Sequence, residues 1–378
     1  MRWPSGKGKT EMEVPLLDMR AQYAELREEI SAAVLSVLES QRCVGGPLVE
    51  ELESKIAEYS GCAAGVGVSS GTDALLCSLM ALEIGPGDEV VTTPYTFFGT
   101  AGSIWRAGAK PVFVDIEPDT FNIDPSKIAA AVTEKTKAVM PVHLCGQMAE
   151  MDPILELADE RGLYVIEDAA QAIGAAYKSR RAGSLGTAGC FSFYPSKNLG
   201  GIGDGGMIVT HDETLAARLR SLRNHGEHAR YVHRWVGGNF RLDAVQAAAL
   251  LVKFKYLDVW SAKRRANAAR YDELFAGFDP VVTPAVREHN VSIFNLYLIR
   301  VPRRDALRAF LAEHGIATAI YYPLPLHQQE CFRPLGGKPG DFPESERAAA
   351  ESLALPVYPE LTDPQIRHVA GKIREFLS

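Results

Sequence analysis

Short apolar runs alternate with amphipathic segments between residues 64 and 166. Each apolar run has the length of a strand that is buried on both faces, and each amphipathic segment has helical spacing. Such an alternation predicts a mostly parallel sheet with helices on both faces, in which ligands bind at the carboxyl ends of the strands. The predicted strands are residues 64–68, 89–93, 111–116, 138–144 and 163–166, and the predicted helices include 70–82, 96–105 and 152–161.

The rest of the chain predicts a second, smaller α+β domain. Residues 291–301 alternate like an antiparallel strand, and residues 304–315 and 363–377 have helical spacing. We therefore expect an α/β fold with a large domain over residues 14–265 and a small C-terminal domain over residues 266–378. Residues 1–13 are polar, lack the apolar centre of a secretory signal and are expected to form a flexible leader.

The composition of the 378 residues excludes several function classes. The net charge of −7 gives no reason to expect nucleic acid or an acidic membrane surface as a partner. No apolar run reaches the length of a membrane span. The six cysteines lack the spacing of a metal or thioredoxin-like motif, so we expect free thiols in a reducing cytoplasm.

A single lysine lies between a short apolar strand and a glycine-rich turn. Residues 191–194 form the expected strand, Lys197 follows, and the turn covers residues 200–206. A lysine in this setting is a candidate for a Schiff base with pyridoxal 5′-phosphate (PLP), which needs a fixed and partly desolvated amine. The alternative is an ordinary exposed loop lysine. The PLP interpretation is favoured because other parts of a PLP site precede Lys197 in the sequence.

Two upstream segments supply polar groups that such a cofactor needs. Gly71 and Thr72 lie at a strand end and a helix N-terminus, where free N–H groups and the helix dipole favour a phosphate, although a plain N-cap explains the segment as well. Asp168 follows a buried strand, so its carboxylate can pair with a pyridinium nitrogen and keep it protonated. Gln171 can reach the phenolic oxygen of the cofactor, with a helix cap as the alternative for this segment.

Five further positions complete the candidate set. Phe97 follows a predicted strand and can stack on the cofactor ring, although core packing is the simpler explanation for it alone. The hydroxyl of Ser192 can contact the same phosphate as Gly71. Asn239 precedes a long helix, where a turn and N-cap is the simple interpretation. Tyr322 and His327 lie in a proline-stiffened loop that either connects the domains or contacts a substrate.

Taken together, these segments resemble the sugar aminotransferases of the DegT/StrS type, within the fold-type I PLP enzymes. The resemblance covers nearly the whole chain, from residue 15 to residue 359. Its motifs occur in one consistent order, and they are Ser70-Gly-Thr-Asp-Ala74, Gly85-Pro-Gly-Asp-Glu-Val90, Pro141-Val-His-Leu-Cys-Gly-Gln147, Glu167-Asp-Ala-Ala-Gln171, Ser192-Phe-Tyr-Pro-Ser-Lys197, Gly238-Asn-Phe-Arg-Leu-Asp243 and Tyr322-Pro-Leu-Pro-Leu-His327. The chain departs from the family at Cys145, where the family often has a tyrosine.

The resemblance implies a role for each cofactor residue. Lys197 would form the Schiff base, Asp168 would face the pyridine nitrogen and Gln171 the phenolic oxygen. Phe97 would stack on the ring. The phosphate would be held by three residues of one subunit and one of its neighbour, namely Gly71, Thr72, Ser192 and Asn239. A residue supplied by the neighbour implies a homodimer with shared active sites.

The implied reaction is a ping-pong transamination. An amino acid, expected to be L-glutamate, gives its amino group to the cofactor. A keto sugar linked to a nucleoside diphosphate then receives that group and becomes an amino sugar. Lys197 would move the proton in both halves of the reaction. Tyr322 and His327 are the candidates for substrate contact.

Other functions stay open at the level of the sequence. Some relatives dehydrate a keto sugar, but they carry a histidine in place of the lysine that this chain retains as Lys197. An amino-cyclitol or an aminobenzoate precursor can replace the nucleotide sugar as substrate. A non-catalytic regulator on the same fold is a further alternative. Arg241 and His225 are open candidates for binding the glutamate carboxylate.

Overall fold

The computed structural model describes residues 12–378. Residues 1–11, most of the expected leader, lie outside the described residues. Where the description begins, Val14 forms a bridge with Ile316, and the N–H of Val14 donates to the carbonyl of Gly315 at 2.9 Å. Within residues 12–378, every helix is too short or too polar to cross a membrane.

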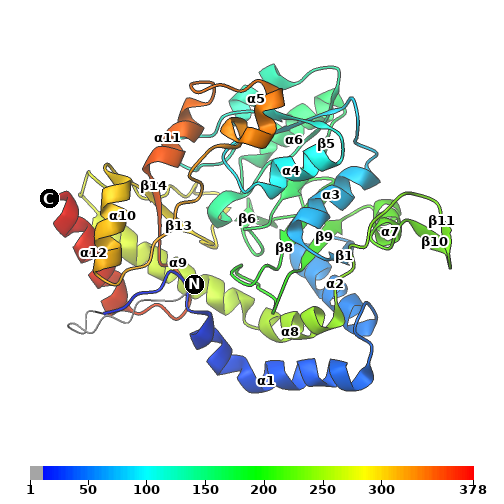
Figure 1. Ribbon diagram of the computed structural model, residues 1–378, viewed down its shortest axis with the longest axis horizontal. Coiled ribbons are helices and arrows are strands. Elements are labelled where there is room, and N and C mark those ends of the chain that lie inside the picture. The colour runs from blue at the N-terminus through cyan, green and yellow to red at the C-terminus, as the bar shows by residue number, and fades with distance from the viewer. Residues whose placement is uncertain (1–11) are drawn as a thin grey trace.

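A seven-stranded sheet forms the centre of the structure (Figure 1). Its strand order is β1-β9-β8-β5-β4-β2-β3, and neighbours are parallel except that β9 runs antiparallel to β1 and β8. This confirms the predicted, mostly parallel sheet. The strands are β1 (Ala64–Val68), β2 (Glu89–Thr92), β3 (Lys110–Phe113), β4 (Thr136–Val139), β5 (Tyr164–Asp168), β8 (Ala188–Ser192) and β9 (Gly206–Thr210).

Helices cover both faces of this sheet, as predicted. Successive strand residues point to opposite faces, so Val90 and Val91 of β2 belong to different hydrophobic clusters, as do Val165 and Ile166 of β5. One face packs against α2 (Pro47–Ser60), α5 (Pro125–Ala131), α6 (Met151–Arg161) and α8 (Ala244–Phe254), and the other against α3 (Gly71–Ala81), α4 (Gly99–Arg106) and α7 (Glu213–Leu222). Helix α1 (Met19–Ser40) lies along α8 on the outside (Figure 1).

The C-terminal part has a hydrophobic cluster of its own. This cluster combines α9 (Leu257–Phe275), α10 (Arg304–Glu313) and α12 (Asp363–Leu377) with the antiparallel pair β13 (Tyr297–Arg300) and β14 (Ser352–Leu355). Helix α9 runs without a break through residues 265 and 266, where we expected one domain to end and the next to begin. The division into two domains stays a prediction.

Helix α11 (Pro343–Glu351) is capped by a residue from the central sheet region. The carboxylate of Asp115 accepts hydrogen bonds from the N–H groups of Glu344 and Ser345, at 3.0 and 2.9 Å. A carboxylate at a helix N-terminus satisfies free N–H groups and complements the helix dipole. Asp115 therefore fixes the C-terminal segment to the large part of the molecule.

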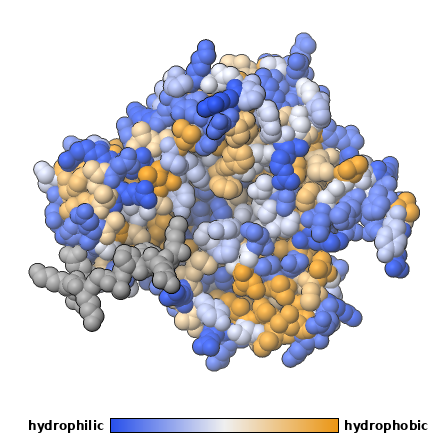
Figure 2. Space-filling model, viewed as in Figure 1, coloured by the Kyte–Doolittle hydropathy of each residue, from blue (hydrophilic) through white to orange (hydrophobic). Residues whose placement is uncertain are grey.

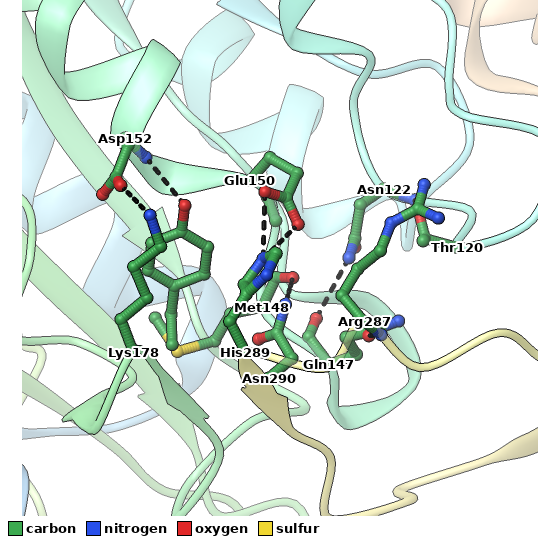
Figure 3. A network of polar contacts seen from close by, with 12 residues as sticks. Thr120, Asn122, Gln147, Met148, Glu150, Asp152, Lys178, Arg287, His289 and Asn290 are labelled. Carbon is green, nitrogen blue, oxygen red and sulfur yellow. Dashed lines mark hydrogen bonds and ion pairs between the residues drawn. The ribbon is translucent and has the colours of Figure 1, made fainter.

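A group of polar contacts ties the segment after α9 to the loop before α6 (Figure 3). The N–H of Arg287 donates to Oε1 of Gln147 at 2.8 Å, and Nε2 of Gln147 donates to the carbonyl of Ala285 at 2.8 Å. The ring of His289 lies 2.8 Å from the carboxylate of Glu150. These contacts join segments about 140 positions apart, so they fix the path of the chain into its C-terminal part.

The remaining described elements are short. A three-stranded sheet, a hairpin and three 3₁₀ turns complete the fold: β6 (Ala176–Tyr177), β7 (Arg180–Arg181), β12 (Asn290–Val291), β10 (Glu227–Ala229), β11 (Val232–His233), η1 (Leu144–Gly146), η2 (Leu326–Gln328) and η3 (Glu330–Leu335). The β10–β11 hairpin projects at the edge of the molecule, beyond α7 (Figure 1).

Candidate active site

Lys197 lies in the connection between the antiparallel neighbours β8 and β9, at the carboxyl end of β8. Its N–H donates to the carbonyl of Tyr194 at 2.8 Å, which closes a tight turn around it. The side chain is half-buried, and burial lowers the pKa of its amine to about 8, against the attraction of Asp168 and Cys145. A lowered pKa makes this lysine a better base and nucleophile near neutral pH.

Asp168 is the last residue of β5, the strand beside β8. Its side chain is 5% exposed; Oδ2 accepts a hydrogen bond from the hydroxyl of Thr100 at 2.7 Å, and Oδ1 accepts one from the N–H of Ala170 at 3.2 Å. Burial raises the pKa of this carboxyl, and the hydrogen bond from Thr100 opposes that rise. Sequence reasoning missed Thr100; its spacing of four from Thr96, to which it is hydrogen-bonded at 2.9 Å, is the available signal.

The side-chain amide of Gln171 connects two segments around the site. Its Oε1 accepts a hydrogen bond from the N–H of Cys145 at 2.8 Å, and its Nε2 donates to the hydroxyl of Tyr322 at 3.2 Å. Burial raises the pKa of the Cys145 thiol to about 12 and raises the pKa of the Tyr322 phenol, so both groups are neutral at physiological pH. Tyr322 thus brings the C-terminal part of the chain to the site.

Three of the expected phosphate residues meet at the N-terminus of α3. Ser70 caps the helix, since its Oγ accepts a hydrogen bond from the N–H of Asp73 at 3.0 Å. A Cβ atom on Gly71 would lie 2.6 Å from Cβ of Ser192, so only glycine fits there. A Cβ atom on Gly99 would lie 2.9 Å from Oγ1 of Thr72, which places Thr72 beside the start of α4. Gly71, Thr72 and the neighbouring Ser192 therefore lie at the N-terminus of α3, where free N–H groups favour an anion.

Phe97 and Phe98 have different surroundings. Phe97 is 57% exposed, and its ring centroid lies 6.3 Å from that of Tyr322. Phe98 instead stacks on Phe332, at 5.4 Å between ring centroids. Phe97 is therefore the ring of this pair that is free to cover a bound ligand.

Two sequence-predicted residues are not brought into contact with this group. Asn239 is exposed and pairs with Asn224 through a backbone bridge. His327 is 2% exposed; its Nε2 lies 3.1 Å from a carboxylate oxygen of Glu346, and its ring packs edge-on against Phe342. The described contacts of His327 are with the C-terminal part of the chain rather than with Lys197.

His143 and Glu167 form a buried pair next to Asp168 at the end of β5. Nδ1 of His143 accepts a hydrogen bond from the N–H of Ala149 at 3.2 Å, so its Nε2 carries the proton that it donates to Glu167 at 2.8 Å. Glu167 also accepts hydrogen bonds from the N–H groups of Gly183 and Gly186. Burial would raise the pKa of Glu167, but these hydrogen bonds outweigh it and lower that pKa.

The residues of this site fit a flat, anionic cofactor with a basic ring nitrogen. The start of α3 has no room for a side chain at Gly71, but its free N–H groups can bind a phosphate. Asp168 is a buried carboxylate that a ring cation would neutralise, and Lys197 is an amine of lowered pKa in the loop after the adjacent strand. These are the groups that PLP chemistry requires.

Comparison with known proteins matches residues 24–374 to the DegT/DnrJ/EryC1/StrS aminotransferase family. The "Pleiotropic regulatory protein" of Geobacillus stearothermophilus is 54% identical over 97% of this chain and 99% of its own length. The "UDP-N-acetyl-3-dehydro-alpha-D-glucosamine 3-aminotranferase" of Acidithiobacillus ferrooxidans is 44% identical over 96% of this chain and 98% of its own.

Solved structures agree with these matches over almost the whole chain. DesV of S. venezuelae, solved in complex with a ketimine intermediate, superposes with a TM-score of 0.95 at 42% identity, covering 97% of this chain and 99% of that one. NtdA of Bacillus subtilis, with bound cofactor PMP, superposes with a TM-score of 0.91 at 31% identity, covering 98% and 87%. The chain belongs to the DegT/DnrJ/EryC1/StrS aminotransferase family.

Proposed function

We propose that this protein is a PLP-dependent aminotransferase that converts a keto sugar linked to a nucleoside diphosphate into an amino sugar. One observation carries the proposal: the buried carboxylate of Asp168, at the end of β5, lies within electrostatic reach of the Lys197 amine, in the loop that follows the adjacent strand β8. Family membership and the relatives named as nucleotide-sugar aminotransferases support the same reaction. We expect the amino donor to be L-glutamate.

Each residue of the site has a definite task in this proposal. PLP, when bound, supplies an electron sink that stabilises negative charge on the carbon next to the transferred nitrogen. Asp168 would hold a proton on the ring nitrogen, and Gln171 would donate to the phenolic oxygen. Phe97 would cover the exposed face of the ring. The phosphate would lie on α3, held by Gly71, Thr72 and Ser192.

Lys197 acts twice in this proposal, first as the amine that attaches the cofactor and then as the base. Its lowered pKa leaves a substantial fraction of the amine unprotonated near pH 8. It would take the proton from the substrate carbon and return it to the cofactor carbon, and then reverse these transfers with the keto sugar. Tyr322 lies beside Gln171 and is the better placed of the two expected substrate residues, because His327 is buried against Phe342.

We also propose that the active protein is a homodimer in which Asn239 reaches the phosphate of the other subunit. Asn239 is exposed, as that role requires. Figure 2 shows an apolar area over α1 and α8, and exposed apolar side chains of this region include Leu35, Leu38 and Val44. A contiguous apolar surface of this kind is typical of a protein interface.

The six free cysteines fit our expectation of a reducing cytoplasm.

The test is to record the visible absorbance of the purified protein with PLP and then to add L-glutamate. The proposal predicts a yellow Schiff-base band that bleaches with glutamate and returns with a keto sugar linked to UDP or dTDP. Lys197→Ala should fold normally, lack that band and lose at least about 10³-fold in turnover, because it lacks both amine and base. A wild-type protein that stays colourless with PLP would contradict the proposal.

A regulatory role is the second candidate, favoured by the name of the Geobacillus stearothermophilus relative. Its test is to complement a strain that lacks this protein with the Lys197→Ala variant, which should keep the fold but lose turnover. Complementation by this variant would favour a non-catalytic role, whereas failure with normal protein levels would favour catalysis. The intact set around Lys197, Asp168 and Gln171 favours catalysis, because a scaffold has no need of it.

A further inference from the structure

The turn that follows Lys197 is unusually tight and depends on glycines. A Cβ atom on Gly200 would lie 2.1 Å from the carbonyl oxygen of Pro195. The N–H of Gly201 donates to the carbonyl of Phe193 at 2.7 Å. Residues 193–195 and 200–201 therefore lie against each other, and Lys197 lies in the short loop that they close.

Two side chains from α8 hold this turn. Nζ of Lys253 donates to the carbonyl of Gly200 at 2.7 Å, and Oε1 of Gln246 accepts from the N–H of Ile202 at 2.8 Å. The two residues are seven positions apart, which places them on the same face of a helix, two turns from each other. A Cβ atom on Gly203 would lie 2.5 Å from Nε2 of Gln246, so the Gln246 amide fits closely against the turn.

The surroundings of Lys253 are costly for a cation. It is 6% exposed, and within residues 12–378 the one hydrogen-bond partner of its ammonium is the neutral carbonyl of Gly200. Burial alone lowers the pKa of its amine to about 8. A buried ammonium without a carboxylate weakens the fold, so a methionine of similar shape would stabilise the protein if packing were its whole role.

We propose that Lys253, together with Gln246, is a positioning residue for Lys197: it holds the turn after Lys197 and so fixes where the Lys197 amine stands. The same loop is also held by Asn198, whose Nδ2 donates to the carbonyl of Ile293 at 3.1 Å. The loop is thus held by two separate segments, α8 and the chain at Ile293. This inference rests on the proposed role of Lys197 in the reaction.

The first test is hydrogen–deuterium exchange of the full-length, cofactor-free protein. Lys253→Met should speed exchange of the amides of Lys197 and Gly201 about tenfold or more, the equivalent of one lost hydrogen bond to a charged group. The strand β9 should exchange at its wild-type rate. Lys255→Met is the matched control, because Lys255 is exposed and pairs with Glu29 at 3.1 Å instead. Unchanged exchange at Lys197 and Gly201 would overturn the proposal, as would an equal increase throughout the protein.

The second test uses kinetics with the loaded enzyme. Lys253→Met should lower kcat roughly 10- to 100-fold, since a misplaced catalytic group has effects of this size, while the KM values for both substrates change less than about twofold. Lys253→Arg keeps a donor and should recover part of the lost kcat. Equal kcat in Lys253→Met and wild type would refute the positioning role.

Failure of this inference can be distinguished from failure of the proposed function. If the wild-type protein binds no PLP, the proposed function is wrong, and the exchange experiment still decides whether Lys253 holds the turn. If Lys253→Met does not fold, Gln246→Leu gives the same test without a change of charge, because it removes the acceptor for the N–H of Ile202. Gln246→Leu should then speed exchange at Gly201, and unchanged exchange in this variant would overturn the proposal.

Discussion

The hydroxyl of Thr100 donates a hydrogen bond of 2.7 Å to Oδ2 of Asp168. Thr100 lies in the first turn of α4 and Asp168 at the end of β5, so this contact joins two elements at the carboxyl edge of the sheet. Burial raises the pKa of Asp168, and a donor to the carboxylate favours its ionised form. Thr100 therefore helps to keep the carboxylate in the state that a ring cation requires.

Thr100→Val should weaken PLP binding about tenfold, because it keeps the side-chain shape and removes one hydrogen bond to a charged group. Titration of the visible absorbance with PLP measures this effect. Thr100→Ser retains the donor and should bind PLP within about twofold of wild type. Equal loss in both variants would contradict this account, because Thr100→Ser keeps the hydroxyl that Thr100→Val removes.

Asp168→Asn should stabilise the cofactor-free protein and abolish turnover. The pKa of Asp168 is raised in the folded state, so the folded protein holds a proton that the unfolded chain releases above its ordinary pKa of 3.8. Stability linked to this group is present below that pH and is lost as the pH rises through the folded-state pKa. Thermal unfolding across pH 4–8 should therefore show a growing advantage for the variant, on the order of 1 kcal/mol at neutral pH. A variant less stable than wild type at pH 7 would contradict this account.

Lys197→Met should flatten part of the stability profile at alkaline pH. The pKa of Lys197 is lowered from 10.5 to about 8 in the folded state, so between these values the unfolded chain binds more protons. Stability of the cofactor-free wild type should therefore rise with pH in this window. Lys253 has the same lowered pKa, so the variant should keep a smaller rise, and chemical unfolding at pH 7.5 and 10 measures the difference. A rise as large as that of the wild type would assign the effect to other groups.

Gly71→Ala should prevent PLP from binding while leaving most of the fold intact. The added Cβ would lie 2.6 Å from Cβ of Ser192, so the start of α3 must move away from the proposed phosphate position. We expect affinity for PLP, measured by equilibrium dialysis, to fall at least about 100-fold, since several phosphate contacts are lost together. Gly371→Ala is the control: it lies within α12 with nothing within 4 Å of its added Cβ, and it should stabilise the protein by roughly 0.5–1 kcal/mol. PLP affinity equal in both variants would remove the phosphate assignment.

Mixing Lys197→Ala with Asn239→Ala should restore activity if the sites are shared. In a hybrid dimer of these two variants, one site carries both defects and the other carries neither. Half of a random mixture is hybrid, so about a quarter of wild-type activity is expected, although each variant alone is nearly inactive. Sequential affinity purification, with a different tag on each variant, checks that subunits have exchanged. A mixture as inactive as its components would place Asn239 in the site of its own chain or outside both sites.

The central sheet could be predicted because each of its strands corresponds to a short, local pattern in the sequence. The runs around Val90 and Ile166 are short, apolar and bounded by polar turns, and both are strands. The long helix expected after Asn239 is divided at residues 255–256 into α8 and α9, since tertiary packing decides such breaks. The antiparallel direction of β9 was also not predictable, because direction depends on partners far away in the chain.

The candidate site shows the same contrast. The positions of Lys197, Asp168 and Gln171 at or after strand ends could be predicted, because each lies in a motif next to an apolar run, whereas their roles stay predictions. The hydrogen bond from Thr100 to Asp168 joins residues 68 positions apart, so no local sequence pattern predicts it. The burial of His327 was likewise invisible, because Glu346 and Phe342 reach it only after α11 has packed.

The hydrogen bond between Gln171 and Tyr322 has a consequence for synthesis of the protein. The two residues are 151 positions apart, so a ribosome that has just made Gln171 needs roughly 8–30 s to reach Tyr322. Once Lys197 has also been made, the growing chain carries the lysine and the carboxylate without the phenol that completes their surroundings. Assembly of this site is therefore a late event in synthesis, and a nascent chain halted before Tyr322 has an incomplete site.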